Sequence, residues 1–173
     1  MKILSPITSQ QQQQVLRKTE SYIHIAADIF NRNFAQIPVY FDLKGRAAGM
    51  YVADHKKQYI RYNPYIFAKY FDDNLASTVP HEVAHYISDV IYGLRKIRPH
   101  GDEWKKIMLS FDVKPAVTSD YDLTGIPLRQ LQRFEYQCGC MVHQLTAIRH
   151  NKVIRGEVSY RCKYCGSPVV FCE

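Results

Sequence analysis

Long hydrophobic runs are absent from the 173-residue sequence, in which no 18 consecutive residues are apolar. A transmembrane helix needs about 20 predominantly apolar residues, so we expect no membrane-spanning segment and no membrane partner. The opening residues also lack the apolar core of a secretion signal, because a proline interrupts them at Pro6. These absences predict a cytoplasmic protein, with association with the nucleoid as an option.

Cysteine is also absent from most of the chain, since no cysteine precedes Cys138. All five cysteines lie in the last quarter of the sequence. In a chain without a secretion signal, such a cluster is more typical of metal ligands than of disulfide bonds. Unrelated cytosolic cysteines are the alternative.

Acidic residues are fewer than basic ones, with 16 Asp and Glu against 23 Lys and Arg and a formal net charge of +7. Residues 129–173 hold seven basic and three acidic residues, and therefore +4 of this charge. The excess points mildly towards an acidic partner such as nucleic acid. An ordinary basic protein explains it at least as well.

The motif H-E-x-x-H occupies residues 81–85, inside an apolar stretch that is compatible with a helix. Residues four apart share a helix face, so His81 and His85 can direct ring nitrogens at one zinc ion. Glu82 lies one step round the helix and can act as the general base towards water in the open position of the metal. The alternative is an amphipathic helix with two hydrogen-bonded histidines and a surface glutamate.

A catalytic zinc ion has three protein ligands, so the histidine pair needs a third. We select His100, because it lies after a loop and directly before a predicted helix over 102–111. That loop gives the chain room to fold back onto the first pair. Asp102 and Glu103 compete for the role, but acids in a first helical turn are better explained by the helix dipole.

The region before the motif predicts helices and a small antiparallel sheet. Apolar spacing of three and four predicts a long helix with its N-cap at Thr8 or Ser9. Small residues at 47–49 let another backbone approach, which suits either pairing with an extended peptide or core packing. Alternating patterns predict strands over 36–43, 47–53 and 58–62.

The start of the motif helix is ambiguous in the sequence. Asp72, Asp73 and Asn74 offer a cap for it. Pro80 removes a backbone donor and crowds the preceding turn. The helix therefore either begins near Ser77 or bends just before the motif.

Beyond the helix over 102–111, Pro and Gly interrupt any period over residues 112–135, which we interpret as a linker able to lie across the first domain. The tail carries Y-x-C-x-x-C-G over 160–166, the knuckle of a zinc ribbon, which requires a second ligand pair. A structural zinc ion takes four ligands and the tail offers five candidate residues, so we predict that four of the five bind it. These five are Cys138, Cys140, His143, Cys162 and Cys165. We do not expect Cys172 to be a ligand.

Basic residues alternate with tyrosines in the same tail. Lys and Arg neutralise phosphates, and aromatic rings such as those of Tyr160 and Tyr164 stack on bases. We therefore predict a nucleic-acid surface, with single-stranded DNA as the favoured partner. Its basic residues are Arg149, Lys152, Arg155, Arg161 and Lys163.

The combination of V-P-H-E-V-A-H, R-P-H-G-D-E-W, Y-Q-C-x-C, R-H-N and Y-R-C-x-x-C-G resembles the SprT-like family of zinc metalloproteases. The resemblance runs from about Gly45 to the C-terminus. It implies an α+β fold, with a zincin-like metalloprotease domain over 1–128 and a zinc ribbon over 129–173. It also implies that His81, His85 and His100 bind the catalytic zinc ion and that Glu82 is the base. The Cys-x-Cys spacing departs from the Cys-x-x-Cys of many ribbons.

The resemblance implies a zinc-dependent endopeptidase with one catalytic and one structural zinc ion. Because the family includes the Spartan proteases, which degrade proteins crosslinked to DNA, DNA-associated or DNA-crosslinked proteins are the implied substrates by analogy. The alternative is a nucleic-acid-binding zinc-ribbon regulator with a vestigial protease site. The intact set of His81, Glu82, His85 and His100 argues against that alternative.

Overall fold

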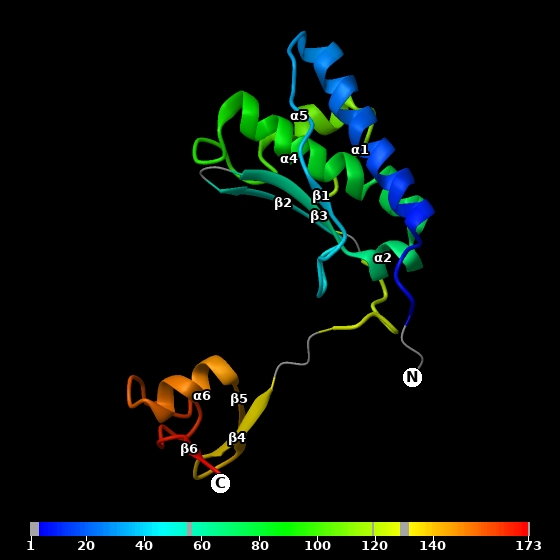
Figure 1. Ribbon diagram of the computed structural model, residues 1–173. Helices are drawn as coiled ribbons and strands as arrows, with labels where there is room; N and C mark the ends of the chain where they lie inside the picture. The colour runs from blue at the N-terminus through cyan, green and yellow to red at the C-terminus, as the bar shows by residue number, and fades with distance from the viewer. Residues whose placement is uncertain (1–3, 55–56, 119, 129–131, 173) are drawn as a thin grey trace. The chain divides into compact units, whose positions relative to one another are not determined.

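The computed structural model describes residues 4–54, 57–118, 120–128 and 132–172. The chain divides into two units, Met1–Leu128 and Arg129–Glu173 (Figure 1). Helices and small sheets are combined in both, so the fold class is α+β. Within the described ranges, no helix is long and apolar enough to cross a membrane.

Helix α1 (Ser9–Phe30) begins as the sequence predicts. The Thr8 hydroxyl accepts a hydrogen bond from the Gln11 N–H, and the Gln11 side chain accepts one from the Thr8 N–H, so two backbone donors at the helix start are paired. The buried side of α1 includes Val15, Tyr22 and Ile23. This side packs against α4 (Thr78–Tyr92).

The sheet of the first unit has the strand order β1-β3-β2, from β1 (Val39–Tyr40), β2 (Gly49–Asp54) and β3 (Lys57–Tyr62). Strands β2 and β3 are antiparallel, as predicted, and residues 55–56 between them lie outside the described residues. Strand β1 corrects the prediction of an antiparallel sheet, because it is only two residues long and pairs parallel to β3.

The path of the chain between β1 and β2 explains this parallel pairing. The segment passes the end of β3, where the Leu43 N–H donates to the Tyr62 carbonyl. The Asn63 side chain then donates to the carbonyls of Gly45 and Ala47, at 3.0 and 3.3 Å. The chain thus reaches the far side of β3 before β2 begins, and β2 forms an edge of this sheet.

Three helices follow the sheet: α2 (Pro64–Lys69), α3 (Phe71–Ala76) and α4. Asn63 caps α2, with Pro64 as its first residue. Helix α4 begins directly after Ser77, so Pro80 falls in the first turn, where a backbone N–H has no partner within the helix. No bend is therefore needed, and Asp72–Asn74 lie inside α3 rather than capping α4.

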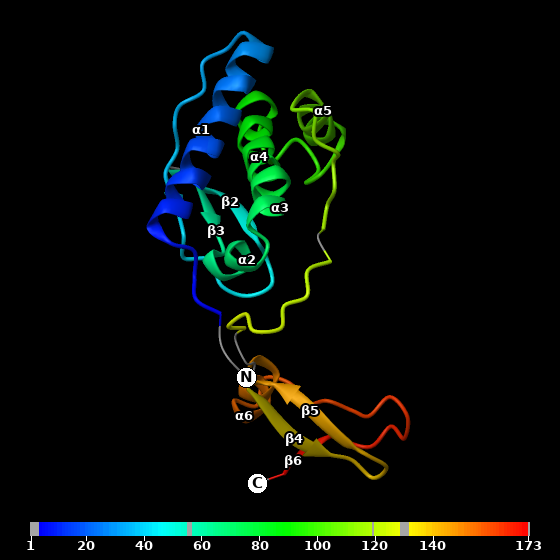
Figure 2. The ribbon, with the colours of Figure 1, turned by 90° about the vertical axis from the view of Figure 1, so that its right-hand side faces the viewer.

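Helix α4 lies at the centre of the first unit. It packs against α1 on one side and α5 (Asp102–Ser110) on the other, with β2 beneath it (Figure 2). Val83, Ala84 and Ile87 of α4 are completely buried in this core. The core face of α5 consists of Trp104, Ile107 and Met108, and Phe111 at its C-terminal end is buried with them.

Residues 112–128 belong to the first unit, which shortens the predicted linker over 112–135. The Leu4 N–H donates to the Gly125 carbonyl at 3.1 Å, and the Lys69 ammonium contacts the Asp122 carboxylate at 2.9 Å. The ring of Tyr121 stacks on Tyr70 with centroids 4.4 Å apart. The segment lies across the first unit as expected, but it is held there by side chains and hydrogen bonds.

The second unit contains the hairpin of β4 (Arg133–Gln137) and β5 (Val142–Thr146), followed by α6 (Ala147–Ile154) and β6 (Val170–Phe171). Strand β4 pairs antiparallel with both β5 and β6. The sequence analysis did not predict α6. Its apolar residues lie at its two ends and not at spacings of three and four, and none of its residues is buried. Ile148 and Ile154 are exposed.

Candidate metal centres and catalytic site

Three histidine side chains converge in the first unit. His81 and His85 lie one turn apart on α4, with their Nε2 atoms 3.2 Å apart. His100 precedes α5, and its Nε2 lies 3.0 Å from the Nε2 atoms of both other rings. The structure therefore brings together the three residues that the sequence selects as metal ligands.

Hydrogen bonds alone do not satisfy this triangle of nitrogens. In a neutral imidazole each ring nitrogen is either a donor or an acceptor, so at least two of the three Nε2 atoms are of the same kind. The His81 Nδ1 lies 3.2 Å from the Ala116 carbonyl, to which it can only donate, and this leaves a lone pair on its Nε2. A cation that accepts lone pairs from all three nitrogens removes the conflict.

The dimensions and charge of the triangle are compatible with zinc. Tetrahedral zinc with Zn–N bonds of about 2.0–2.1 Å places two nitrogens about 3.3 Å apart, close to the observed separations. Burial, together with the smaller effect of the neighbouring histidines, lowers the pKa of His81 to about 4 and that of His85 to about 3. Neutral rings with free lone pairs are therefore present at pH 7.

The Glu82 carboxyl is buried beside the histidines, with 6% of the residue exposed. Strand β2 fixes it, because the Tyr51 N–H donates to its Oε2 at 2.7 Å. Burial raises the pKa of Glu82 to about 8 in the metal-free protein, and the Tyr51 hydrogen bond acts in the opposite direction. The sequence analysis missed this backbone contact, which no side-chain pattern records.

Gly49 makes room for Glu82. A Cβ at this position would lie 2.6 Å from the Glu82 Cγ and 2.8 Å from the Thr78 Cγ2, closer than real Cβ atoms approach other atoms. The small residues at 47–49 were predicted to let another backbone approach, but the group that lies close to Gly49 is the Glu82 side chain.

Gly49→Ala is expected to lower the rate of any reaction that uses Glu82 by about 100-fold, because a shift of about 1 Å in a reacting group has an effect of this size. Initial rates and zinc content measured together test this prediction. Ala53→Gly, at the exposed end of the same strand, is the control and should leave the rate unchanged. An unchanged rate in Gly49→Ala would show that Glu82 tolerates the displacement.

An open cavity of about 530 Å³ borders these groups. Its walls are the edge strand β2, the first turns of α4, His100 and residues 114–118. A larger cavity of about 780 Å³ lies between the β2–β3 strands and residues 93–96, and neither the three histidines nor Glu82 line it. The three histidines and Glu82 therefore open into the first cavity.

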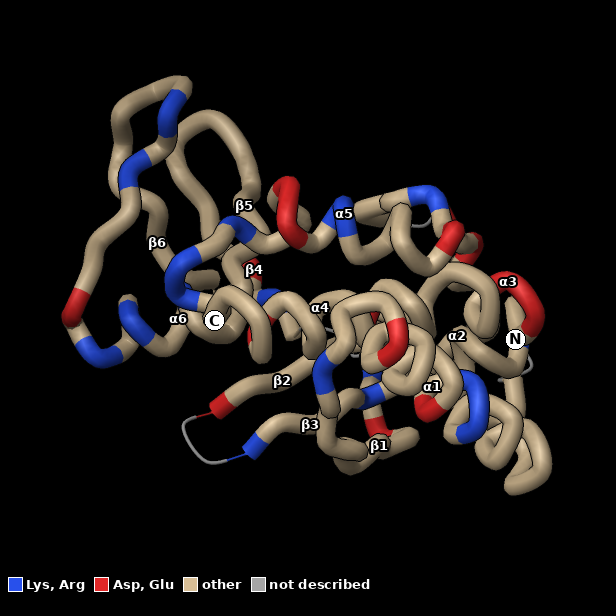
Figure 3. The backbone as a smooth tube through the Cα atoms, turned by 90° about the horizontal axis from the view of Figure 1, so that it is seen from above, with Lys and Arg blue, Asp and Glu red and all other residues tan. Residues whose placement is uncertain are grey.

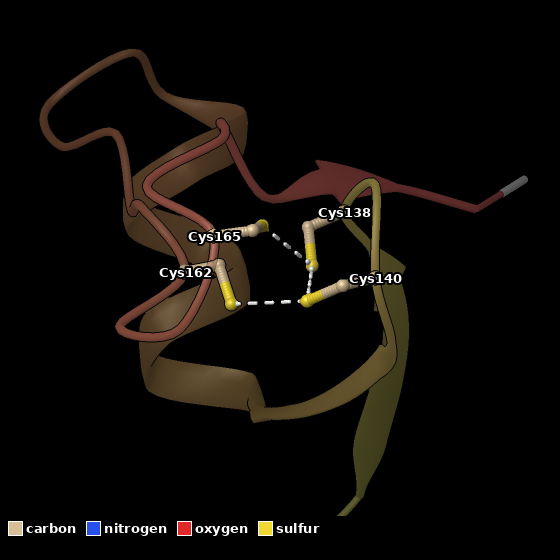
Figure 4. A group of neighbouring side chains, drawn as sticks. All are labelled: Cys138, Cys140, Cys162 and Cys165. Carbon is tan, nitrogen blue, oxygen red and sulfur yellow. Dashed lines mark hydrogen bonds between the residues drawn. The ribbon is translucent and has the colours of Figure 1, made fainter.

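Four cysteines form the second candidate metal centre (Figure 4). The Sγ atoms of Cys138 and Cys140 are 3.5 Å apart, and those of Cys140 and Cys162, and of Cys165 and Cys138, are each 3.7 Å apart. Tetrahedral zinc with Zn–S bonds of about 2.3 Å separates two sulfurs by about 3.8 Å. The set is compatible with one zinc ion.

His143, the fifth candidate, lies next to this cluster, with its Nε2 3.2 Å from the Cys138 Sγ. The cluster of four among the described residues consists of cysteines alone and also omits Cys172, whose N–H donates to the Glu135 carbonyl. Hydrogen bonds from Ser167 lower the pKa of Cys165 to about 6, which favours the thiolate that a metal requires.

The five basic residues predicted to contact nucleic acid are all exposed on the second unit. Arg155 pairs with Glu157 at 2.7 Å, Arg161 donates to the Gly166 carbonyl, and Arg149 lies over the Tyr160 ring. Figure 3 shows Lys and Arg on α6 and on the segment that follows it. Tyr164 is 84% exposed in the same unit, which leaves its ring free to stack.

Comparison with known proteins decides the family. The family model described as the SprT-like family matches residues 19–123, more than half of the chain. The chain belongs to the SprT-like family. Protein SprT of Vibrio parahaemolyticus is 39% identical over 150 residues, which cover 86% of this chain and 87% of the relative. Protein SprT of Shewanella oneidensis is 37% identical over 155 residues, covering 89% and 95%. No solved structure matches the chain.

The resemblance deduced from the motifs is thereby confirmed, and the SprT-like match includes both histidines of α4, Glu82 and His100. The cysteine cluster lies beyond the matched residues. The relatives nevertheless align over most of this SprT-like chain, at 33–39% identity.

Proposed function

We propose that this SprT-like protein is a zinc-dependent endopeptidase with a zincin-like catalytic unit. The observation that carries the proposal is the convergence of three histidine Nε2 atoms beside the buried Glu82 carboxyl, at a cavity bordered by an edge strand. His81, His85 and His100 would hold the zinc ion. When bound, the ion polarises a carbonyl and lowers the pKa of water towards neutrality.

Glu82 is the general base and then the general acid. Its carboxylate takes a proton from the water whose oxygen adds to the peptide carbonyl carbon. It then passes that proton to the amide nitrogen as the C–N bond breaks, so one water is consumed per bond. The Tyr51 N–H and the space at Gly49 hold the carboxyl for both transfers.

The second unit is proposed to be a zinc ribbon with a structural metal held by Cys138, Cys140, Cys162 and Cys165. A unit of this size buries too little apolar surface to fold without such a cross-link. Two sulfur atoms come from the turn between β4 and β5 and two from the C-x-x-C segment, and their proximity supports this assignment. His143 would then contact a ligand sulfur without binding the metal itself.

The substrates are proposed to be proteins associated with, or crosslinked to, DNA. Support comes from the exposed basic residues and Tyr164 of the second unit, together with membership of the family. The same basic residues suit the alternative of a nucleic-acid-binding regulator with a vestigial protease site. Against this alternative, Glu82 is buried, hydrogen-bonded and adjacent to a complete histidine set.

Exchanging both Lys152 and Lys163 for Glu is expected to lower the affinity for single-stranded DNA. It should also make this affinity less dependent on salt concentration. Removal of one phosphate interaction lowers the slope of log affinity against log salt by about 0.7 for a single strand, so the double variant should show a decrease of about 1.4. Titrations at several salt concentrations measure it, with Lys44→Glu, an exposed lysine of the other unit, as the control. Equal slopes in the wild type, the double variant and the control would show that Lys152 and Lys163 do not contact DNA.

Hydrolysis of a protein substrate, analysed by mass spectrometry, tests the enzymatic proposal. Products whose summed masses exceed the substrate by one water, formed only when zinc is present, are the expected result. Intact substrate in the presence of zinc and DNA would favour the regulator.

A further inference from the structure

The indole of Trp104 contacts all three histidines of the candidate metal site. Its ring centroid lies 4.7 Å from those of His81 and His100, at interplanar angles of 64° and 78°. It stacks on His85 at 28°, with centroids 5.6 Å apart. Trp104 is 1% exposed and is the single tryptophan of the chain. One rigid, buried side chain therefore packs against all three imidazole rings.

A hydrogen bond fixes this indole to the helix that carries two of the histidines. The Trp104 Nε1–H donates to the His81 carbonyl at 3.3 Å. Trp104 itself belongs to α5, which follows His100 directly. The indole thus joins the turn of α4 that bears His81 and His85 to the helix that sets the position of His100.

His100 needs support of this kind. Its φ angle is +57°, in the left-handed region that residues with a Cβ adopt uncommonly. A backbone conformation of this type persists only when its surroundings hold it. The Gly101 N–H donates to the Arg98 carbonyl at 2.9 Å, which fixes the turn before α5 but leaves the direction of the imidazole open. The indole edge and the other two histidines provide the ring contacts of His100.

We propose that Trp104 is a positioning residue that holds the three imidazoles in the geometry required to bind the metal. This inference rests on the proposed histidine site. Aromatic rings at these separations attract one another most in edge-to-face and offset-stacked arrangements, and both occur here. Contacts behind metal ligands restrict their orientation, and their removal typically lowers metal affinity about 10- to 100-fold.

Trp104→Phe in the full chain tests the role, since Phe keeps an aromatic ring in the core but removes the Nε1–H and the second ring. We expect the affinity of the histidine site for Zn²⁺, measured by competition with a chelator, to fall at least about 10-fold. Phe111→Leu is the matched control. Phe111 is a buried aromatic residue at the other end of the same helix, and its ring pairs with Tyr22. It should lower thermal stability without changing metal affinity.

Wild-type metal affinity in Trp104→Phe would overturn the positioning role, as would an equal loss in Phe111→Leu. Trp104 fluorescence in the wild type separates this failure from failure of the histidine site itself. Co²⁺ quenches a nearby indole, so we expect quenching that His100→Ala removes. Absence of such quenching, with the cysteine cluster loaded, would refute the histidine metal site and the inference with it. Quenching together with unchanged affinity in Trp104→Phe would refute only the inference.

Discussion

Glu82→Gln is expected to stop hydrolysis while leaving the fold and the metal content unchanged. The amide has the shape of the carboxylate, and its oxygen can still accept the Tyr51 N–H, but it cannot take a proton from water. General acid–base groups contribute about 10²- to 10⁴-fold to rate, so a loss in that range or larger is expected. Initial cleavage rates and zinc content by mass spectrometry measure the two parts separately.

The control for this variant is Glu103→Gln. Glu103 lies in the first turn of α5 and was, with Asp102, one of two competing ligands in the sequence. It is absent from the histidine cluster of the described residues. This variant should retain both activity and metal. Hydrolysis by Glu82→Gln at the wild-type rate would show that another group moves the proton. Loss of zinc from Glu82→Gln would instead indicate that Glu82 acts on the metal rather than on water.

The second large effect is expected for Cys162→Ser, which removes a buried sulfur from the cysteine cluster. Hydroxyl oxygen is a poor replacement for thiolate at such a site, and binding of a structural zinc ion is coupled to folding. We expect the variant to hold one zinc ion fewer than the wild type. Residues 129–173 should become sensitive to limited proteolysis, while the helical signal of the first unit persists.

Cys172→Ser provides the matched control because Cys172 lies outside the four-sulfur cluster. It should retain the full metal content and resistance to proteolysis. A protease-resistant second unit in Cys162→Ser, with unchanged zinc, would contradict the structural role of the cluster. Loss of zinc from Cys172→Ser would show that the ligand set differs.

The histidine site was predictable because its geometry follows from helix periodicity. Residues 81 and 85 face the same way on any α-helix, and the acids Asp102 and Glu103 mark the first turn of the helix that follows His100. How closely α4 and α5 bring the three imidazoles together depends on the packing of Trp104 against these rings. No local pattern in the sequence predicts that packing. Sequence reasoning therefore selects the ligands but not the residue beneath them.

Contacts through the main chain explain what was missed around Glu82. The hydrogen bonds of the Tyr51 N–H to Glu82 and of the Ala116 carbonyl to His81 involve main-chain atoms. Any residue other than proline at position 51, and any residue at position 116, could make them, so composition and spacing do not predict them. The parallel β1 was missed for a related reason, because strand direction depends on where the chain crosses β3. Local alternation predicts a strand but not its neighbour.

In the second unit, the cysteine cluster could be predicted from the sequence, but helix α6 could not. Four thiols close to one another follow from the C-x-C segment in the turn between β4 and β5 and the C-x-x-C segment after α6. Helix α6 has its apolar residues only at its two ends, so it lacks the recurrence at three and four from which helices are recognised.

The most direct test of the central claim is cleavage of a DNA-binding protein by the wild type, with and without single-stranded DNA. Wild type stripped of metal, wild type reloaded with zinc, and Glu82→Gln are assayed in parallel. The account predicts cleavage by the zinc-loaded wild type when DNA is present, loss on stripping, recovery on reloading, and none by Glu82→Gln. An intact substrate in every sample, from protein that binds DNA and contains two zinc ions, would contradict it.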